Sequence, residues 1–269
     1  MCRLVAYKGA SIPLGQLIFD PPHSLEVQSY DPQELLSGTV NVDGFGCGWY
    51  NPDLSRAPGV YSSLDTLWSD AGFRSISRVI ESSMIFGALR SATPPSPVDP
   101  QSVMPFTRGR YLFMHNGFFK PYHEKVKRRL QARIPEDLFS TLHSHSDSAA
   151  LFAVLYDFLR KGEPSLENLV SSLIQLMDVG RSLAAEADVE FQANILVSDG
   201  DRIAGVRASN TEESNSLYYL QNGEVFPDAL VIASERLNDE SRWERVPHNS
   251  IIRVDARNRI NIQPLTTGE

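Results

Sequence analysis

The second residue of the chain combines two groups that could together break an amide bond. Cys2 follows Met1, and a small second residue permits removal of the initiator methionine. Removal would leave a thiol and a free α-amine on one residue, with unperturbed pKa values of about 8.5 and about 8. Such an amine can act as the base for its own side-chain nucleophile. Cys2 is thus a candidate nucleophile, and the alternative is a cysteine that merely follows the start and packs as a small apolar side chain.

Two further positions could bind the charges of an acyl-transfer substrate. Arg90 ends an apolar run of strand length, and its planar guanidinium can bind a carboxylate through two hydrogen bonds. The alternative for Arg90 is an ion pair with a surface acid. Asn116 and Gly117 follow another such run, and they could present a side-chain NH₂ and a backbone N–H to an oxyanion. Taken alone, an Asn-Gly pair after a strand predicts a turn.

A polar segment before an expected helix offers a third candidate. Ser146 or Asp147 could cap this helix, and the Asp147 carboxylate could also bind a ligand ammonium group. The nearby His143 and His145 suggest a metal site, but no H-E-x-x-H pattern or cysteine ligand set completes one. A solvated polar loop is therefore favoured over a metal site here.

In the first third of the chain, the elements that must position these residues are short strands. We expect strands over 3–8, 44–50, 84–90 and 111–115. Glycine alternates with larger residues from Gly44 to Tyr50, which is typical of a strand where backbones approach closely. The segment between the last two strands predicts a binding loop or lid stiffened by proline. Its prolines are Pro94, Pro95, Pro97, Pro100 and Pro105.

The middle of the chain has helical periodicity, and the last third returns to strands. We expect helices over 122–132, 147–160 and 165–187. Strands are expected over 194–198, 202–207, 216–220, 230–233 and 251–255, with turns at 199–201 and 222–223. Strands, then helices, then strands predict an α+β fold of packed layers. No second-domain boundary is visible, so one domain is expected over 1–265, with a frayed tail at 266–269.

The composition excludes several classes of protein. Lys and Arg number 25 against 33 Asp and Glu, a net charge of −8, which argues against a nucleic-acid partner. A basic cluster at Lys125, Lys127, Arg128 and Arg129 indicates a solvated helix face rather than an anion site. No stretch approaches the ~20 apolar residues of a membrane helix, and no secretory signal is visible. We therefore expect a cytoplasmic protein that acts without a membrane, with two unpaired cysteines.

The set of motifs, taken in order, resembles the class II glutamine amidotransferases, which are N-terminal-nucleophile hydrolases. The motifs are Cys2, Asp43-Gly44-Phe45-Gly46-Cys47-Gly48-Trp49-Tyr50, Leu89-Arg90-Ser91-Ala92-Thr93, His115-Asn116-Gly117 and Ser146-Asp147-Ser148. Within the class the chain is most similar to the EgtC-type γ-glutamyl amidohydrolases of ergothioneine biosynthesis. That resemblance extends to Pro21-Pro22-His23-Ser24-Leu25, Gln28-Ser29-Tyr30 and Ile232-Ala233-Ser234-Glu235-Arg236-Leu237.

The resemblance implies a fold and a role for each matched residue. The fold is an αββα sandwich with the free N-terminus at the open end of a sheet. Cys2 is then the nucleophile, and Asn116 with the N–H of Gly117 forms the oxyanion hole. Arg90 and Thr93 hold the α-carboxylate of the glutamyl group, and Asp147 holds its α-amine. By the same resemblance, Cys47 is a packing residue.

The resemblance also implies a reaction, hydrolysis of a γ-glutamyl amide without a metal or an organic cofactor. The expected partner is a small γ-glutamyl substrate, such as a γ-glutamyl hercynylcysteine sulfoxide, because no synthase domain is visible to accept ammonia. Aromatic residues near the motifs could line a pocket for its leaving group, although Phe45 and Trp49 are expected in the core. The others are Tyr30, Phe118, Phe119 and Tyr122.

Three alternatives stay open at this point. The chain could be a glutaminase subunit or a γ-glutamyl peptide hydrolase that works with a partner chain, such as a synthase. As a separate possibility, it could form a homo-oligomer. It could also be a non-catalytic γ-glutamyl-binding or scaffold protein. Retention of Met1 would favour the non-catalytic alternative, because the α-amine of Cys2 would then be blocked.

Overall fold

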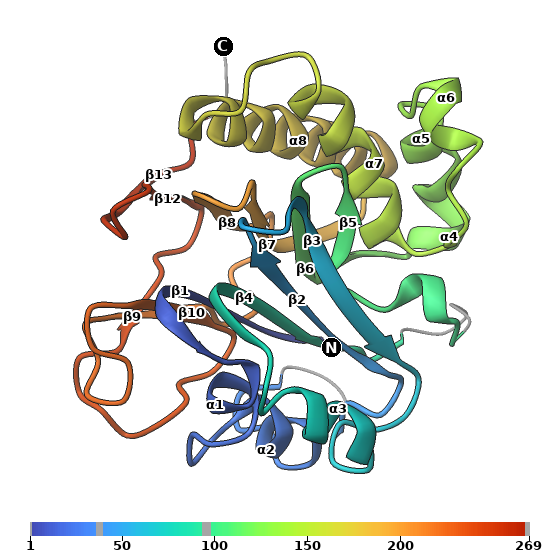
Figure 1. Ribbon diagram of the computed structural model, residues 1–269. Helices are drawn as coiled ribbons and strands as arrows, with labels where there is room; N and C mark the ends of the chain where they lie inside the picture. The colour runs from blue at the N-terminus through green and yellow to red at the C-terminus, as the bar shows by residue number, and fades with distance from the viewer. Residues whose placement is uncertain (1, 36–39, 93–97, 267–269) are drawn as a thin grey trace.

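Two antiparallel sheets lie face to face, with helices on both outer sides (Figure 1). The computed structural model describes residues 2–35, 40–92 and 98–266. Helices α1 (Leu14–Ile18), α2 (Leu25–Tyr30) and α3 (Ala71–Ile76) cover one sheet, and α7 (Asp147–Leu159) and α8 (Leu166–Ala187) cover the other. These four layers confirm the predicted αββα sandwich.

The first sheet, sheet A, contains the N-terminal strand at its centre. In the described ranges its order is β11-β9-β10-β1-β4-β2-β3. The strands are β1 (Arg3–Pro13), β2 (Phe45–Asn51), β3 (Ser55–Ser63), β4 (Glu81–Leu89), β9 (Tyr218–Gln221), β10 (Leu230–Ala233) and β11 (Glu244–Arg245). Strand β1 pairs with β4 on one side and with β10 on the other, so the start of the chain is held between two strands.

The second sheet, sheet B, carries the Asn-Gly pair. Its order in the described ranges is β13-β12-β8-β7-β6-β5. The strands are β5 (Phe106–Arg108), β6 (Tyr111–Lys120), β7 (Glu190–Ser198), β8 (Ile203–Ser209), β12 (Ser250–Val254) and β13 (Ile260–Pro264). Strands β1 and β4 of sheet A contact β6 of sheet B, so the strand that follows the N-terminus packs against the strand that carries the Asn-Gly pair.

Side chains alternate between the two faces of each strand, as strand geometry requires. Leu4 and Ala6 of β1 join the core between the sheets, whereas Val5 and Tyr7 face the α1–α3 layer. Strand β2 runs close to the backbone of the segment before β5, since a Cβ on Gly46 would lie 2.3 Å from the carbonyl oxygen of Met104. This finding confirms the close backbone approach predicted for the glycine-rich strand.

Capping side chains fix the ends of the two long helices. The Ser146 Oγ accepts a hydrogen bond from the Ala149 N–H at 3.2 Å, so α7 begins at Asp147. The Ser165 Oγ does the same for the Asn168 N–H at 3.0 Å, so α8 begins at Leu166. Helix α7 begins at the predicted residue, and α8 begins one residue later than predicted.

Several predictions about local structure are wrong. The helix expected over 122–132 is divided at Val126 into α4 (Tyr122–Lys125) and α5 (Lys127–Gln131). The expected loop before β6 contains a short helix, η1 (Pro100–Ser102), and strand β5. Strand β3 and the short helices α1, α2, α3 and α6 (Glu136–Phe139) were not predicted. Pro94, Pro95 and Pro97 of that loop, and 267–269 of the expected frayed tail, lie outside the described residues.

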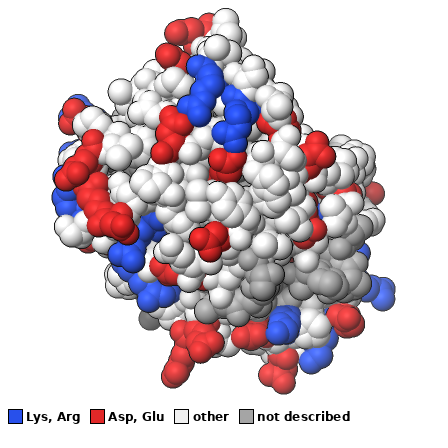
Figure 2. Space-filling view, turned by 90° about the horizontal axis from the view of Figure 1, so that it is seen from below, with Lys and Arg blue, Asp and Glu red and all other residues white. Residues whose placement is uncertain are grey.

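The charges on one face of the molecule, and the lengths of the described helices, can be compared with the expectations for partners. In the face that Figure 2 shows from below, Lys and Arg are interspersed with Asp and Glu, and no continuous basic area forms on the residues drawn in colour. Among the described helices, none combines the length and the apolar character needed to cross a membrane.

Candidate active site

Cys2 lies immediately before β1, at the edge where sheet A ends. It is half-buried against the core between the sheets, on the side occupied by Leu4 and Ala6. The Cys2 Sγ lies 3.9 Å from the carbonyl oxygen of Ser91, a long contact for a thiol donor. Met1 itself lies outside the described residues. The thiol therefore lies at the N-terminal end of β1, against the core between the two sheets.

Arg90 lies beside Cys2 because of the register of β1 and β4. Arg3 pairs with Leu89 at the end of the ladder, so Cys2 and Arg90 are the residues that follow this pair in the same register. Met84, Phe86 and Ala88 face the core between the sheets, and alternation places the buried Arg90 on that same side. Thr93, the second residue expected to hold the carboxylate, lies outside the described residues.

The residues just before the glycine-rich strand β2 hydrogen-bond to the backbone of the segment that contains Arg90. The Arg90 N–H donates to the carbonyl oxygen of Gly44 at 2.8 Å, and the Asp43 Oδ2 accepts from the Ala92 N–H at 2.7 Å. Cys47, on the same strand, is fully buried on the opposite face, and burial raises the pKa of its thiol. Cys47 is therefore a packing residue, as predicted, because a buried neutral thiol is a poor nucleophile.

Asn116 and Gly117 lie inside β6, where they pair with Asn194 and Ala193 of β7. The prediction of a turn at this Asn-Gly pair is therefore wrong. A strand needs glycine at 117 because a Cβ there would lie 2.0 Å from the carbonyl oxygen of Gln192. The interstrand contact, rather than a turn conformation, explains why this position is glycine.

The Asn116 side chain is fully buried, and it lies on the face of β6 toward sheet A, with Leu112 and Met114. Neither its Nδ2 nor its Oδ1 has a hydrogen-bond partner among the described residues. A buried amide without partners costs about 1–3 kcal/mol, so such groups are rare unless they serve a function. An amide donor that is buried, without a partner among the described residues and on the face toward sheet A can bind an oxyanion.

Asp147 is the first residue of α7 and is half-buried. The Ser148 N–H donates to its Oδ1 at 2.7 Å, which fixes the orientation of the carboxylate. The Ser148 Oγ in turn lies 2.9 Å from the Nδ1 of His115 on β6. The structure thus connects Asp147 to the strand that carries Asn116 and Gly117.

A buried charged cluster beneath Cys2 was missed by the sequence reasoning. The Arg3 Nη1 donates to the carbonyl oxygen of Cys2 at 3.1 Å, and the Arg3 Nε lies 2.8 Å from the Glu235 Oε1. The His23 Nε2 lies 2.7 Å from the other Glu235 oxygen. Burial alone would raise the pKa of the Glu235 carboxyl, but the hydrogen bond to His23, the Gln33 N–H and the Arg3 charge together hold it below its usual value.

This cluster ties the backbone of Cys2 to three distant segments of the chain. His23 and Glu235 fall within the resembling segments at 21–25 and 232–237, which was the available signal. Their mutual contacts could not be found from the sequence because Arg3 and Glu235 meet only through the pairing of β1 with β10.

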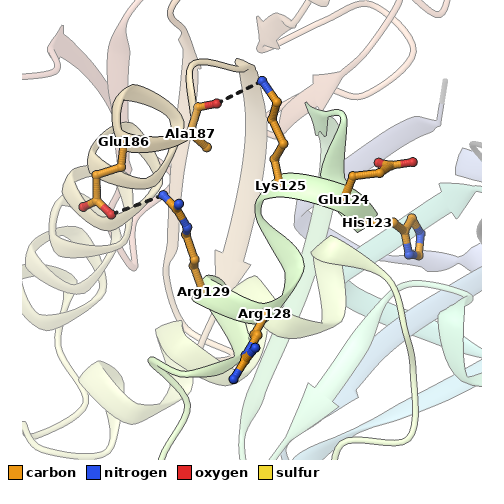
Figure 3. Close-up of a pocket in the computed structure, with 7 residues that line it drawn as sticks. All are labelled: His123, Glu124, Lys125, Arg128, Arg129, Glu186 and Ala187. Atoms are coloured by element: carbon orange, nitrogen blue, oxygen red, sulfur yellow. Dashed lines mark hydrogen bonds and ion pairs between the residues drawn. The ribbon is translucent and has the colours of Figure 1, made fainter.

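The basic cluster at 125–129 has a structural role. Figure 3 shows Lys125 and Arg129 directed toward the C-terminal end of α8 and Arg128 directed away from it. The Lys125 Nζ donates to the carbonyl oxygen of Ala187 at 3.3 Å, and Arg129 lies 3.8 Å from Glu186. These contacts favour helix capping over an anion site, because a cation near a helix C-terminus stabilises it.

The comparisons with known proteins agree on a family. The chain is 30% identical over 254 residues to a γ-glutamyl-hercynylcysteine sulfoxide hydrolase of Mycobacterium tuberculosis, covering 94% of this chain and 93% of that protein. It is 31% identical to the protein of the same name from Mycolicibacterium smegmatis, covering 94% and 96%. A probable glutamine amidotransferase of Saccharomyces cerevisiae is 26% identical, covering 94% and 82%. No protein-family model matches the chain.

Solved structures agree on the fold. A class II glutamine aminotransferase domain protein of Silicibacter pomeroyi superposes with a TM-score of 0.71 at 18% identity, covering 98% of this chain and all of that chain. The glutamine phosphoribosylpyrophosphate amidotransferase of Bacillus subtilis superposes with a TM-score of 0.64 at 12% identity, covering 99% of this chain and 50% of that chain.

Proposed function

This chain belongs to the class II glutamine amidotransferases, enzymes that act on C–N amide bonds, and we propose that it hydrolyses a γ-glutamyl amide with Cys2 as nucleophile. The observation that carries the proposal is that Cys2 and the unpartnered amide of Asn116 lie on the facing sides of two sheets whose strands β1 and β6 contact each other. The similarity to two γ-glutamyl-hercynylcysteine sulfoxide hydrolases supports a substrate of that type.

The reaction begins after Met1 has been removed. The Cys2 thiol gives its proton to the α-amine, and the thiolate attacks the γ-carbonyl carbon. The carbonyl oxygen becomes an oxyanion, which the Asn116 Nδ2 and the Gly117 N–H stabilise. The α-amine then protonates the leaving amine, and the C–N bond breaks to give a thioester. Water, activated by the same α-amine, hydrolyses the thioester to release glutamate and the thiol.

The substrate's glutamyl group is held by charges on either side of this centre. Arg90 binds its α-carboxylate, and the Asp147 carboxylate binds its α-ammonium group. Arg90 is buried beside Cys2, and Asp147 has one oxygen fixed by the Ser148 N–H. Thr93 completes the carboxylate site in this proposal, from a position outside the described residues.

The Arg90→Lys variant is expected to raise KM for a γ-glutamyl amide by about tenfold, with a smaller effect on kcat. A planar guanidinium binds a carboxylate through two hydrogen bonds, and an ammonium group replaces this fork poorly. Steady-state kinetics of the purified variant measure this effect. Arg108→Lys is a matched control, because Arg108 on β5 is half-buried and bonds to the Thr141 hydroxyl. An unchanged KM in Arg90→Lys would assign Arg90 a structural role only.

The aromatic residues near the motifs divide into core and site. The core between sheet A and its helices contains Phe45, and Trp49 packs against that core. The core between sheet B and its helices contains Phe119 and Tyr122. Phe118 is half-buried, and it lies two residues after Asn116 on the same face of β6. In this proposal Phe118 contacts the leaving group, where an aromatic face would attract a quaternary ammonium group.

A side-by-side assay of three substrates tests the proposed specificity. We expect a γ-glutamyl hercynylcysteine sulfoxide to exceed glutamine in kcat/KM by about 30- to 1,000-fold, from apolar burial and one cation–π contact. γ-Glutamylcysteine should lie between the two, and Phe118→Leu should reduce the preference. Equal efficiency on all three substrates, or glutamine as the best, would reject this specificity and favour a glutaminase that works with a partner.

The non-catalytic alternative is tested by the mass of the purified protein. An intact mass that lacks Met1 is expected, because the mechanism requires the free α-amine of Cys2. A protein that retains Met1 and binds γ-glutamyl compounds without hydrolysing them would instead be a binding protein.

A further inference from the structure

His115 lies on the opposite face of β6 from Asn116, toward the α7 and α8 layer. Its neighbours on that face, Phe113 and Phe119, are core residues. The His115 ring is buried, and both of its nitrogens face polar atoms. The Nδ1 lies 2.9 Å from the Ser148 Oγ, and the Nε2 lies 3.4 Å from the carbonyl oxygen of Gln192. A buried polar ring in an otherwise apolar layer, engaged at both ends, indicates a specific role.

The Ser148 hydroxyl connects this ring to the Asp147 carboxylate. The Ser148 Oγ lies 3.3 Å from the Asp147 Oδ1, and the Ser148 N–H donates to the same oxygen at 2.7 Å. One Asp147 oxygen is thus occupied by Ser148, which leaves the other to a ligand. Burial lowers the pKa of the His115 ring, although the nearby Asp147 charge opposes this shift.

The His115 ring also contacts Gly117, two residues further along β6. A Cβ on Gly117 would lie 2.4 Å from the His115 Nε2, so the ring rests directly against the Gly117 α-carbon. His115 therefore contacts the backbone of the proposed oxyanion hole and, through Ser148, the carboxylate proposed to bind the substrate's ammonium group.

We propose that His115 and Ser148 are positioning residues that hold the Asp147 carboxylate at a fixed place relative to Asn116 and Gly117. The γ-glutamyl α-ammonium and the reacting carbonyl are then aligned by one connected unit of the protein. This inference rests on the proposed function, because it assigns Asp147 to the α-ammonium. It predicts that loss of the Ser148 hydroxyl impairs recognition of the α-amine more than it impairs the chemistry.

The test compares two amides with the same leaving amine, a γ-glutamyl amide and a glutaryl amide, which lacks the α-amine. Wild-type protein should favour the γ-glutamyl amide in kcat/KM by roughly 10- to 100-fold, the usual range for a hydrogen bond to a charged group. In Ser148→Ala this ratio should fall by about three- to tenfold, with kcat/KM on the glutaryl amide changed less than threefold. Ser148→Thr, which keeps the hydroxyl, should restore the ratio, and His115→Gln should lower it.

Ser165→Ala is the matched control, because it removes a helix-capping hydroxyl from α8 and has no contact with Asp147. Its substrate ratio should equal that of the wild type. The ratio is measured within one preparation, so it is independent of the fraction of protein that is folded. If Ser148→Ala does not yield folded protein, the positioning role is tested with His115→Gln and Ser148→Thr. The same ratio of kcat/KM for the two amides is then compared.

The two proposals fail in distinguishable ways. Wild-type protein that cleaves neither amide, or both equally well, would contradict the proposed function and this inference with it. Wild-type protein that favours the γ-glutamyl amide, together with an unchanged ratio in both Ser148→Ala and His115→Gln, would overturn the inference alone. A ratio that Ser148→Thr fails to restore, while Ser148→Ala lowers it, would also contradict the role of the hydroxyl.

Discussion

Replacement of Cys2 by alanine is expected to lower kcat/KM on a γ-glutamyl amide by at least about 10⁴-fold, the scale seen when an enzyme loses its nucleophile. Without the thiol no thioester can form, and the remaining donors can only stabilise a direct attack by water. The fold should be retained, because among the described residues the Cys2 thiol makes only one long contact, at 3.9 Å to the carbonyl oxygen of Ser91. The variant should still bind the substrate, which equilibrium binding measurements can show.

Cys47→Ala is the matched control for this prediction. Cys47 is buried among apolar side chains beneath sheet A, so its truncation should cost about 1 kcal/mol of unfolding free energy. Its activity should remain near that of the wild type. Alkylation should distinguish the two cysteines in the same way, since burial raises the pKa of Cys47 and shields it from reagents. Activity of Cys2→Ala within tenfold of the wild type would remove Cys2 from the mechanism.

The layered fold could be predicted because the chain carries strong local signals at the right places. The apolar period of 147–160, capped by Ser146, gives α7 to within one residue. The helix α8 follows its capping Ser165 in the same way. Strand β10 also has the predicted bounds, 230–233. These elements form the core layers, where burial and periodicity agree.

The missed elements are those whose pattern is set by distant contacts. Strand β3 contains no buried residue, and its sequence, SRAPGVYSS, contains little apolar alternation. The Asn116-Gly117 pair has the composition of a turn, and only the pairing with β7 makes it a strand. The Arg3–Glu235 pair joins residues at opposite ends of the chain, and local pattern carries no information about such a pair. Cys2, Arg90 and Asp147 could be selected by their chemistry, but their arrangement depends on the register of two sheets.

Replacement of Asn116 by alanine is expected to lower kcat by about 10²- to 10³-fold with little change in KM, the usual consequence of removing one oxyanion donor. The ground-state carbonyl gains little from the donor, whereas the tetrahedral oxyanion gains most, so the loss is concentrated in the chemical step. Asn116→Asp should be similarly impaired, because a carboxylate keeps the shape but cannot donate a hydrogen bond and repels the oxyanion.

The stability of these variants separates a catalytic asparagine from a structural one. Neither polar atom of the Asn116 amide has a partner among the described residues, so its removal should leave the unfolding free energy unchanged or raise it, even though Asn116 is fully buried. Asn194, its neighbour across the ladder, donates to the carbonyl oxygens of Asn215 and Ser216 at 3.3 and 2.9 Å. Asn194→Ala should therefore lose about 1–3 kcal/mol of stability. If Asn116→Ala raised KM alone, or destabilised the protein as Asn194→Ala does, Asn116 would be a binding or structural residue, and the oxyanion hole would lie elsewhere.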